Sequence, residues 1–275
     1  RIFGIRVYIH WTFLLLLGWV VVKVQYVELI GEVLFFIAAV FACILLHEFG
    51  HALAARRFNI KTKEIVLLPI CGLTRLERTP DDPVQELWVA VAGPAVNVAI
   101  AILLLAWLLA TSPLQPSQWF ALAAPFPARL LSVNVSLVLL NLVPAFPMDG
   151  GRVLRALLAM KMRYFTATRI ASYLGQGLAA AFMLYVVGGM VGLYQGPMIG
   201  GLSLIVGLFV FFGAQEEIHA AGLRALFKGL YVRDVMVPGY READLLLPVE
   251  EAVDLLIDEE HEDFLVMEGS RLAGV

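Results

Sequence analysis

Six long apolar runs fill the first 213 residues of this 275-residue chain and constrain its fold more than any other feature. A helix needs about 20 consecutive apolar residues to cross a bilayer, and most of these runs reach that length. Charged residues make up only 16% of the sequence, whereas soluble domains average about 25%. We therefore predict an all-α polytopic membrane protein with six transmembrane helices. The runs are Val7–Val27, Val33–Ala55, Leu87–Ala110, Leu130–Ala145, Ile170–Leu193 and Ile199–Phe212.

The charges are divided unevenly along the chain. Residues 1–213 contain 15 basic and 9 acidic residues, whereas residues 214–275 contain 5 basic and 14 acidic ones. This change predicts a membrane domain over residues 1–213, a linker over residues 214–230 and a small polar domain over residues 231–275. The net charge of the chain is −3, whereas nucleic-acid-binding proteins carry an excess of basic residues. We therefore expect no nucleic-acid partner.

The basic residues between the apolar runs predict the orientation, because they collect on the cytoplasmic side of a membrane. Thirteen lie on one side of the predicted spans, and only Lys23 and Arg129 lie on the other. We expect a multi-pass protein of the cell membrane, surrounded by the lipid bilayer, with both termini in the cytoplasm. The thirteen are Arg1, Arg6, Arg56, Arg57, Lys61, Lys63, Arg75, Arg78, Arg152, Arg155, Lys161, Arg163 and Arg169.

Residues 60–78, between the second and third runs, do not follow a helical pattern. Residues 61–70 are rich in β-branched and apolar side chains, and after Gly72 the chain returns over residues 73–77. This pattern predicts a small β-hairpin. Non-helical backbone at membrane depth is tolerated only against protein or water, so we expect the hairpin to pack on the helices at the cytoplasmic edge.

The second run contains His47, Glu48 and His51 in the pattern HExxH. Residues four apart share one face of a helix, so two imidazoles can bind one Zn²⁺. The glutamate beside the first histidine can reach the water of the metal instead of the metal itself. Ionisable side chains inside a span are costly and mark functional sites. The alternative is that the three polar side chains only pair with one another.

A third ligand is expected on another span, because catalytic zinc usually takes three protein ligands and a water. Asp149 ends the fourth run, in the segment NLVPAFPMDGGR over residues 141–152. Its prolines break the helix and Gly150 and Gly151 permit a tight turn, so the carboxylate can bend toward a neighbouring helix. The alternative is an aspartate in an ordinary cytoplasmic turn.

These two motifs together resemble those of the site-2 protease family, the intramembrane zinc metalloproteases. Residues 6–13 (RVYIHWTF), 67–72 (LLPICG) and 93–97 (GPAVN) also match that family. The resemblance covers the whole membrane part. It is nearest to prokaryotic members with six spans and a C-terminal cystathionine-β-synthase (CBS) domain.

The resemblance implies one Zn²⁺ per chain, held by His47, His51 and Asp149, with Glu48 as the general base. It implies that Asn141 binds the substrate, holding its backbone or polarising its carbonyl. The implied activity is regulated intramembrane proteolysis. Zinc-activated water would hydrolyse a peptide bond in or near the transmembrane helix of a membrane-protein substrate.

Two positions of the resemblance leave their roles open. Asn97 matches a family asparagine, and a structural role and a role near the site are equally compatible with it. Cys71 stands where the family hairpin usually has glycine, either as one small residue replacing another or as a thiolate near the metal. We also expect a substrate strand to pair with Leu67–Ile70 as the substrate leaves its helix.

The acidic tail resembles the opening of a CBS domain through Val232-Arg-Asp-Val-Met-Val-Pro238. Residues 249–257 have a helical apolar stripe, and residues 264–275 predict strand, turn, strand. We interpret residues 231–275 as the start of a CBS domain, too short to form a complete module. The complete module would bind an adenine nucleotide and could support a homodimer.

A different class of function also accounts for charge inside the membrane. A CBS-regulated ion transporter or channel could use His47, Glu48, His51 and Asp149 as an ion path. Such a path is expected near the membrane midplane, however, and it does not require two histidines four residues apart beside a glutamate.

Overall fold

The computed structural model describes residues 4–23, 27–68, 72–80, 82–111, 124–193, 202–227, 229–235, 242–257, 265–269 and 271–274. The chain divides into two compact units, Arg1–Ala225 and Leu226–Val275. The first unit contains the HExxH motif and Asp149, and each unit is described by itself below.

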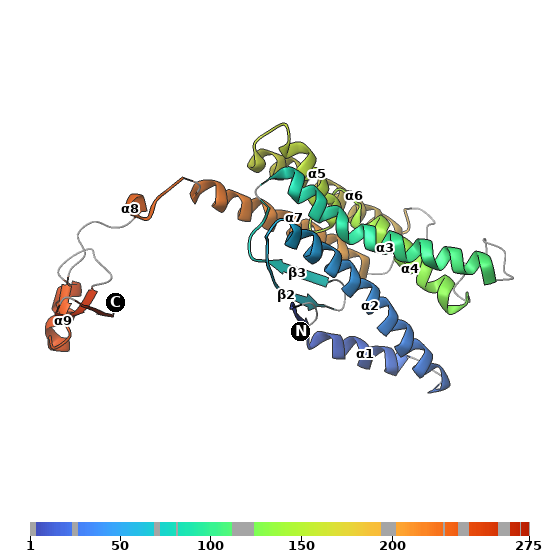
Figure 1. Cartoon of the computed structure of the whole chain (residues 1–275), viewed down its shortest axis with the longest axis horizontal. Helices are drawn as coiled ribbons and strands as arrows, with labels where there is room; N and C mark the ends of the chain where they lie inside the picture. Colours follow the sequence, from blue (N-terminus) through green and yellow to red (C-terminus); the bar gives the residue numbers. More distant parts are fainter. Residues whose placement is uncertain are drawn as a thin grey trace. The chain divides into compact units, whose positions relative to one another are not determined.

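Apolar helices dominate the described part of the first unit (Figure 1). Four of them, α2, α3, α6 and α7, are long and apolar enough to cross a membrane, while α1 and α4 are shorter apolar helices. The prediction of a mostly helical fold with membrane helices is therefore confirmed. The bounds are α1 (Thr12–Lys23), α2 (Val27–Arg57), α3 (Pro83–Thr111), α4 (Phe126–Asn141), α5 (Asp149–Ala159), α6 (Tyr164–Met190) and α7 (Leu202–Phe227).

Several helix boundaries differ from the predicted spans, and three of these differences change the element assignment. The first run does not begin as a helix, because Arg6–Ile9 forms strand β1 before α1 starts at Thr12. Helix α4 ends at Asn141 and not at Ala145, consistent with the two prolines that follow. Helix α7 continues to Phe227, through residues that the sequence analysis assigned to a linker.

The expected hairpin is part of a three-stranded sheet. Strand β2 (Thr62–Leu67) pairs antiparallel with β3 (Gly72–Leu76) and parallel with β1 (Arg6–Ile9), in the order β1-β2-β3. Since both edges of β2 are already paired, the expected pairing of a substrate with Leu67–Ile70 is wrong at Leu67. Leu68 follows the end of β2, and residues 69–71 lie outside the described part. Among the described strands, none pairs with the outer edge of β3.

Helix α3 holds the first unit together. It packs against α2, α4 and α5, and the sheet packs on α2. Phe49 and Ala52 of α2 share one buried cluster with Ile5 and Ile65, so the sheet lies against α2 at the HExxH motif. Figure 1 shows β2 and β3 beside the end of α2.

The second unit is small and mixed. Its described elements are α8 (Val232–Val235), β4 (Glu242–Asp244), α9 (Val249–Ile257), β5 (Leu265–Glu268) and β6 (Arg271–Gly274). Strand β4 is parallel to β5, and β5 is antiparallel to β6. A helix between two parallel strands is the βαβ arrangement.

A buried ion-pair network joins α3, α5 and α7. The guanidinium of Arg155 donates from Nε to Oε1 of Glu86 at 2.8 Å and from Nη1 to Oε2 of Glu217 at 2.6 Å. It also lies over the rings of Phe146 and Tyr164. Burial alone would lower the pKa of Arg155, but the interactions with Glu86, Tyr164 and Glu217 together outweigh it and the pKa is raised. The side chains of Arg155 and Glu86 are only 3% and 5% exposed, whereas that of Glu217 is 30% exposed, so it is Glu86 that depends on Arg155 for its neutralisation.

We predict that Arg155→Met destabilises the protein by about 3–5 kcal/mol, because it leaves the carboxylate of Glu86 buried without its cation. Denaturant unfolding of the detergent-solubilised protein measures the change. The matched control is Arg75→Met, whose pair with Glu64 is largely exposed and should cost about 0–1 kcal/mol. Equal losses in the two variants would contradict the prediction.

Candidate active site

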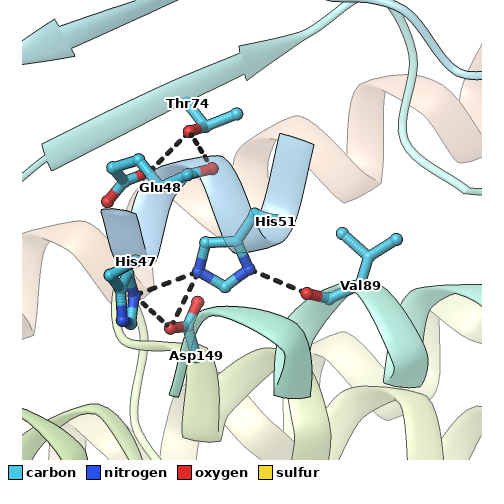
Figure 2. A network of polar contacts seen from close by, with 6 residues as sticks. All are labelled: His47, Glu48, His51, Thr74, Val89 and Asp149. Carbon is cyan, nitrogen blue, oxygen red and sulfur yellow. Dashed lines mark hydrogen bonds and ion pairs between the residues drawn. The ribbon is translucent and has the colours of Figure 1, made fainter. Parts of the chain in front are cut away.

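Helix α2 presents the two histidines on one face, as the HExxH spacing predicts (Figure 2). The Nε2 atoms of His47 and His51 lie 3.1 Å apart. Both residues are buried, at 6% and 4% exposure. Because the Nε2 atoms of both imidazoles point to the same place, the two rings can bind one metal ion together.

Asp149 joins them from a different element than expected. It does not end the fourth predicted span; it is the first residue of the short helix α5. The positive end of a helix dipole favours a carboxylate there. Gly150 makes the turn possible, because a Cβ at this position would collide with the carbonyl oxygens of Leu142 and Val143.

The three side chains form a compact triangle of ligand atoms. Oδ2 of Asp149 lies 3.1 Å from Nε2 of His47 and 3.2 Å from Nε2 of His51. Tetrahedral zinc with bonds of about 2.0–2.1 Å requires ligand atoms about 3.3 Å apart. The donor set and its spacing therefore fit Zn²⁺, and within the described residues this is the cluster with metal-binding geometry.

Only one of the two histidines has a partner for its second ring nitrogen among the described residues. Nδ1 of His51 donates to the carbonyl oxygen of Val89 at 2.7 Å, which directs the Nε2 lone pair toward the other ligands (Figure 2). Nδ1 of His47 is buried and has no hydrogen-bond partner there.

Gly93 of α3 closes one side of the triangle. A Cβ at this position would lie 2.7 Å from Nε2 of His47 and would also strike Nε2 of His51. The metal-binding atoms therefore face bare backbone, and only glycine leaves this space.

Glu48 points to β3 and is not part of the metal cluster. Its Oε2 accepts a hydrogen bond from Oγ1 of Thr74 at 2.6 Å, so the sheet holds the carboxylate (Figure 2). Gly72 lies against the same side chain, since a Cβ there would be 2.5 Å from Oε1. A carboxylate that lies beside a metal site without being one of its ligands has the position that a general base needs.

The remaining residues that the sequence indicated for the site are not part of the metal cluster among the described residues. Asn141 is the half-buried last residue of α4 and does not belong to the described metal cluster. Cys71 lies outside the described residues. The roles of Thr74, Gly93 and Val89 were missed: Thr74 and Val89 contact the site across the fold, and only the GPAVN match pointed to the neighbourhood of Gly93.

We predict that Gly93→Ala lowers the zinc affinity about tenfold or more, because the new methyl group displaces the histidine rings. Competition with a chelator on the purified protein measures the affinity. Gly177→Ala on α6 is the control, since a Cβ there meets no atom within 4 Å. Unchanged affinity in Gly93→Ala would show that the histidines tolerate the methyl group.

Comparisons with known proteins agree with this geometry. The sequence pattern of peptidase family M50 matches residues 35–128 and 117–186. A zinc metalloprotease of Methanocaldococcus jannaschii is 32% identical over 278 residues, which cover 100% of this chain and 76% of that protein. Stage IV sporulation protein FB of Bacillus subtilis is 28% identical over 210 residues, 75% of this chain and 65% of that protein.

The solved structure of a site-2 protease from Methanocaldococcus jannaschii has the same fold. It superposes with a TM-score of 0.57 at 33% identity, over 79% of this chain and 93% of that one. The family pattern matches more than half of the chain, and the 32% identical relative matches the chain over its whole length. The chain belongs to peptidase family M50 and is a zinc metalloendopeptidase of the site-2 protease type.

Proposed function

We propose that this protein cleaves a peptide bond in or near the transmembrane segment of membrane-protein substrates. The observation that carries the proposal is the buried triangle of His47, His51 and Asp149, with Glu48 held beside it by Thr74. The ligand triangle lies at the end of an apolar helix, so the bond to be cleaved must reach it from within or next to the bilayer.

The chain's own residues divide the chemistry between them. His47, His51 and Asp149 would hold Zn²⁺, which when bound lowers the pKa of a water ligand to about 7. Glu48 takes the proton from the attacking water and gives it to the leaving amine. Asn141 holds the substrate and donates to the carbonyl oxygen as negative charge develops there.

The outer edge of β3 is the proposed docking strand for the substrate. An extended segment adds to an exposed strand edge through backbone hydrogen bonds, and β2 has no edge left. The hydroxyl group of Thr74 on β3 donates a hydrogen bond to the carboxylate of Glu48. A segment paired with β3 would therefore lie within reach of the base.

The proposed topology is six passes with both termini in the cytoplasm. The six passes would be the four long apolar helices together with the shorter apolar helices α1 and α4. The excess of basic residues on one side of the predicted spans would set the orientation in the membrane. In this orientation the metal site lies near the cytoplasmic edge, since Arg56 and Arg57 end α2 a few residues after His51.

The tail is proposed to be the beginning of a CBS module. The alternation of β4, α9, β5 and β6 supports an α/β unit of this kind. Nucleotide binding and a homodimer through such modules would regulate access to the protease. The transporter alternative is not favoured, because the matched family and relatives are metalloproteases.

We predict that Glu48→Gln keeps its zinc and loses cleavage of a co-expressed membrane substrate by a factor of about 100 or more, because the base is gone while the three ligands remain. Metal analysis and immunoblotting measure the two properties. Glu32→Gln on the same helix α2, whose exposed carboxylate pairs with Arg129, should cleave normally. Cleavage by Glu48→Gln at the normal rate would refute the proposed base.

We predict that a photo-crosslinking residue at Leu73 of β3 captures the substrate in the Glu48→Gln background. The same residue at Tyr8, on the opposite edge strand β1, is the control and should capture little. Both side chains are exposed, at 39% and 46%, so access alone does not separate them. Stronger capture at Tyr8 than at Leu73 would contradict docking on β3.

A further inference from the structure

His47, Asn97 and Asn134, on α2, α3 and α4, are among the buried side chains that keep polar atoms without a hydrogen-bond partner in the described part of the chain. The atoms are Nδ1 of His47, both amide atoms of Asn97, and Oδ1 of Asn134. Both asparagines are completely buried, at 0% exposure. Buried polar groups are nearly always satisfied by protein or by ordered water, so these atoms require partners.

The contacts between α2 and α3 place Asn97 near His47. As residue numbers rise along α3 they fall along α2: Val89 contacts His51, and Gly93 faces Nε2 of His47 and His51. Asn97 lies one turn beyond Gly93 on the same face of α3, about 6 Å along the axis. It therefore lies at the level of His47 and of Cys43, which is one turn earlier on α2.

Asn134 borders the same level from α4; its Oδ1 is unpaired among the described residues, but the contacts of its Nδ2 already orient the carboxamide. Its Nδ2 donates to the carbonyl oxygen of Leu130 at 2.9 Å and lies 3.5 Å from Sγ of Cys43. Asn97 has neither kind of contact within the described residues. The carboxamide of Asn97 is thus available to an unpaired donor at the same level.

We propose that Asn97 is a positioning residue for the metal site. Its carboxamide oxygen accepts the Nδ1–H of His47, directly or through one buried water, and so fixes the ring with Nε2 toward the metal. This gives His47 what Val89 gives His51 (Figure 2). Outer partners of this kind orient metal-binding histidines and raise their basicity. The inference rests on the proposed zinc site.

The test compares zinc affinity in variants of the full chain by competition with a chelator. Asn97→Leu, which has no polar atom, should bind zinc about 10–100-fold more weakly. The visible spectrum of the Co²⁺-loaded protein should change as the geometry of the histidine loosens. Asn134→Leu is the matched control: it removes an equally buried amide from the same level and should leave zinc affinity and the Co²⁺ spectrum unchanged.

The outcomes separate this inference from the proposed function. Wild-type zinc affinity in Asn97→Leu, or equal weakening in Asn97→Leu and Asn134→Leu, overturns the positioning role of Asn97. Neither result contradicts the proposed protease function. If Asn97→Leu does not fold, Asn97→Thr and Asn97→Val replace it; they have nearly the same shape and only threonine retains an acceptor. Tighter zinc binding by the threonine variant supports the inference, and equal binding overturns it. A wild-type protein without zinc would overturn both proposals.

Discussion

Two imidazoles and a carboxylate lie together in one small, buried volume, and the rest of the structure must accommodate them. Each of these groups is costly away from water unless it is paired or bound to a metal. Their ligand atoms lie 3.1–3.2 Å apart, and the surrounding backbone must approach closely without intruding. Glycine meets this requirement on both sides: Gly93 on α3 faces the histidines, and Gly150 allows α5 to start at Asp149.

The position of Asp149 then depends on what holds α5. That helix is anchored by Arg155, less than two turns after Asp149, through Glu86 on α3 and Glu217 on α7. The same guanidinium lies over Phe146, in the segment that leads into α5. A charged network outside the metal site thus fixes the element that carries its third ligand, and α3 contributes both to this network and to the site.

The sequence predicted the parts of the site that depend on local spacing. HExxH on a helix places His47 and His51 together by geometry alone. The segment with the two prolines correctly indicated that the helix is interrupted before Asp149. The strand Arg6–Ile9 was missed because a short apolar run has the same composition at the start of a membrane helix. Arg155 was counted only among the basic residues between the apolar runs, since its burial against Glu86 depends on the packing of α3 on α5. The contact of Thr74 with Glu48 joins residues 26 positions apart, which no spacing rule anticipates.

The outer edge of β3 has a consequence for which proteins such a site can act upon. A strand edge offers backbone N–H and C=O groups and is nearly indifferent to side chains. A segment that is still helical uses those groups internally and has none to exchange. If substrates pair with β3, the property being selected is the ease with which a membrane helix unravels locally. Helix-weakening residues such as glycine and proline would then mark a substrate more strongly than any sequence around the cleaved bond.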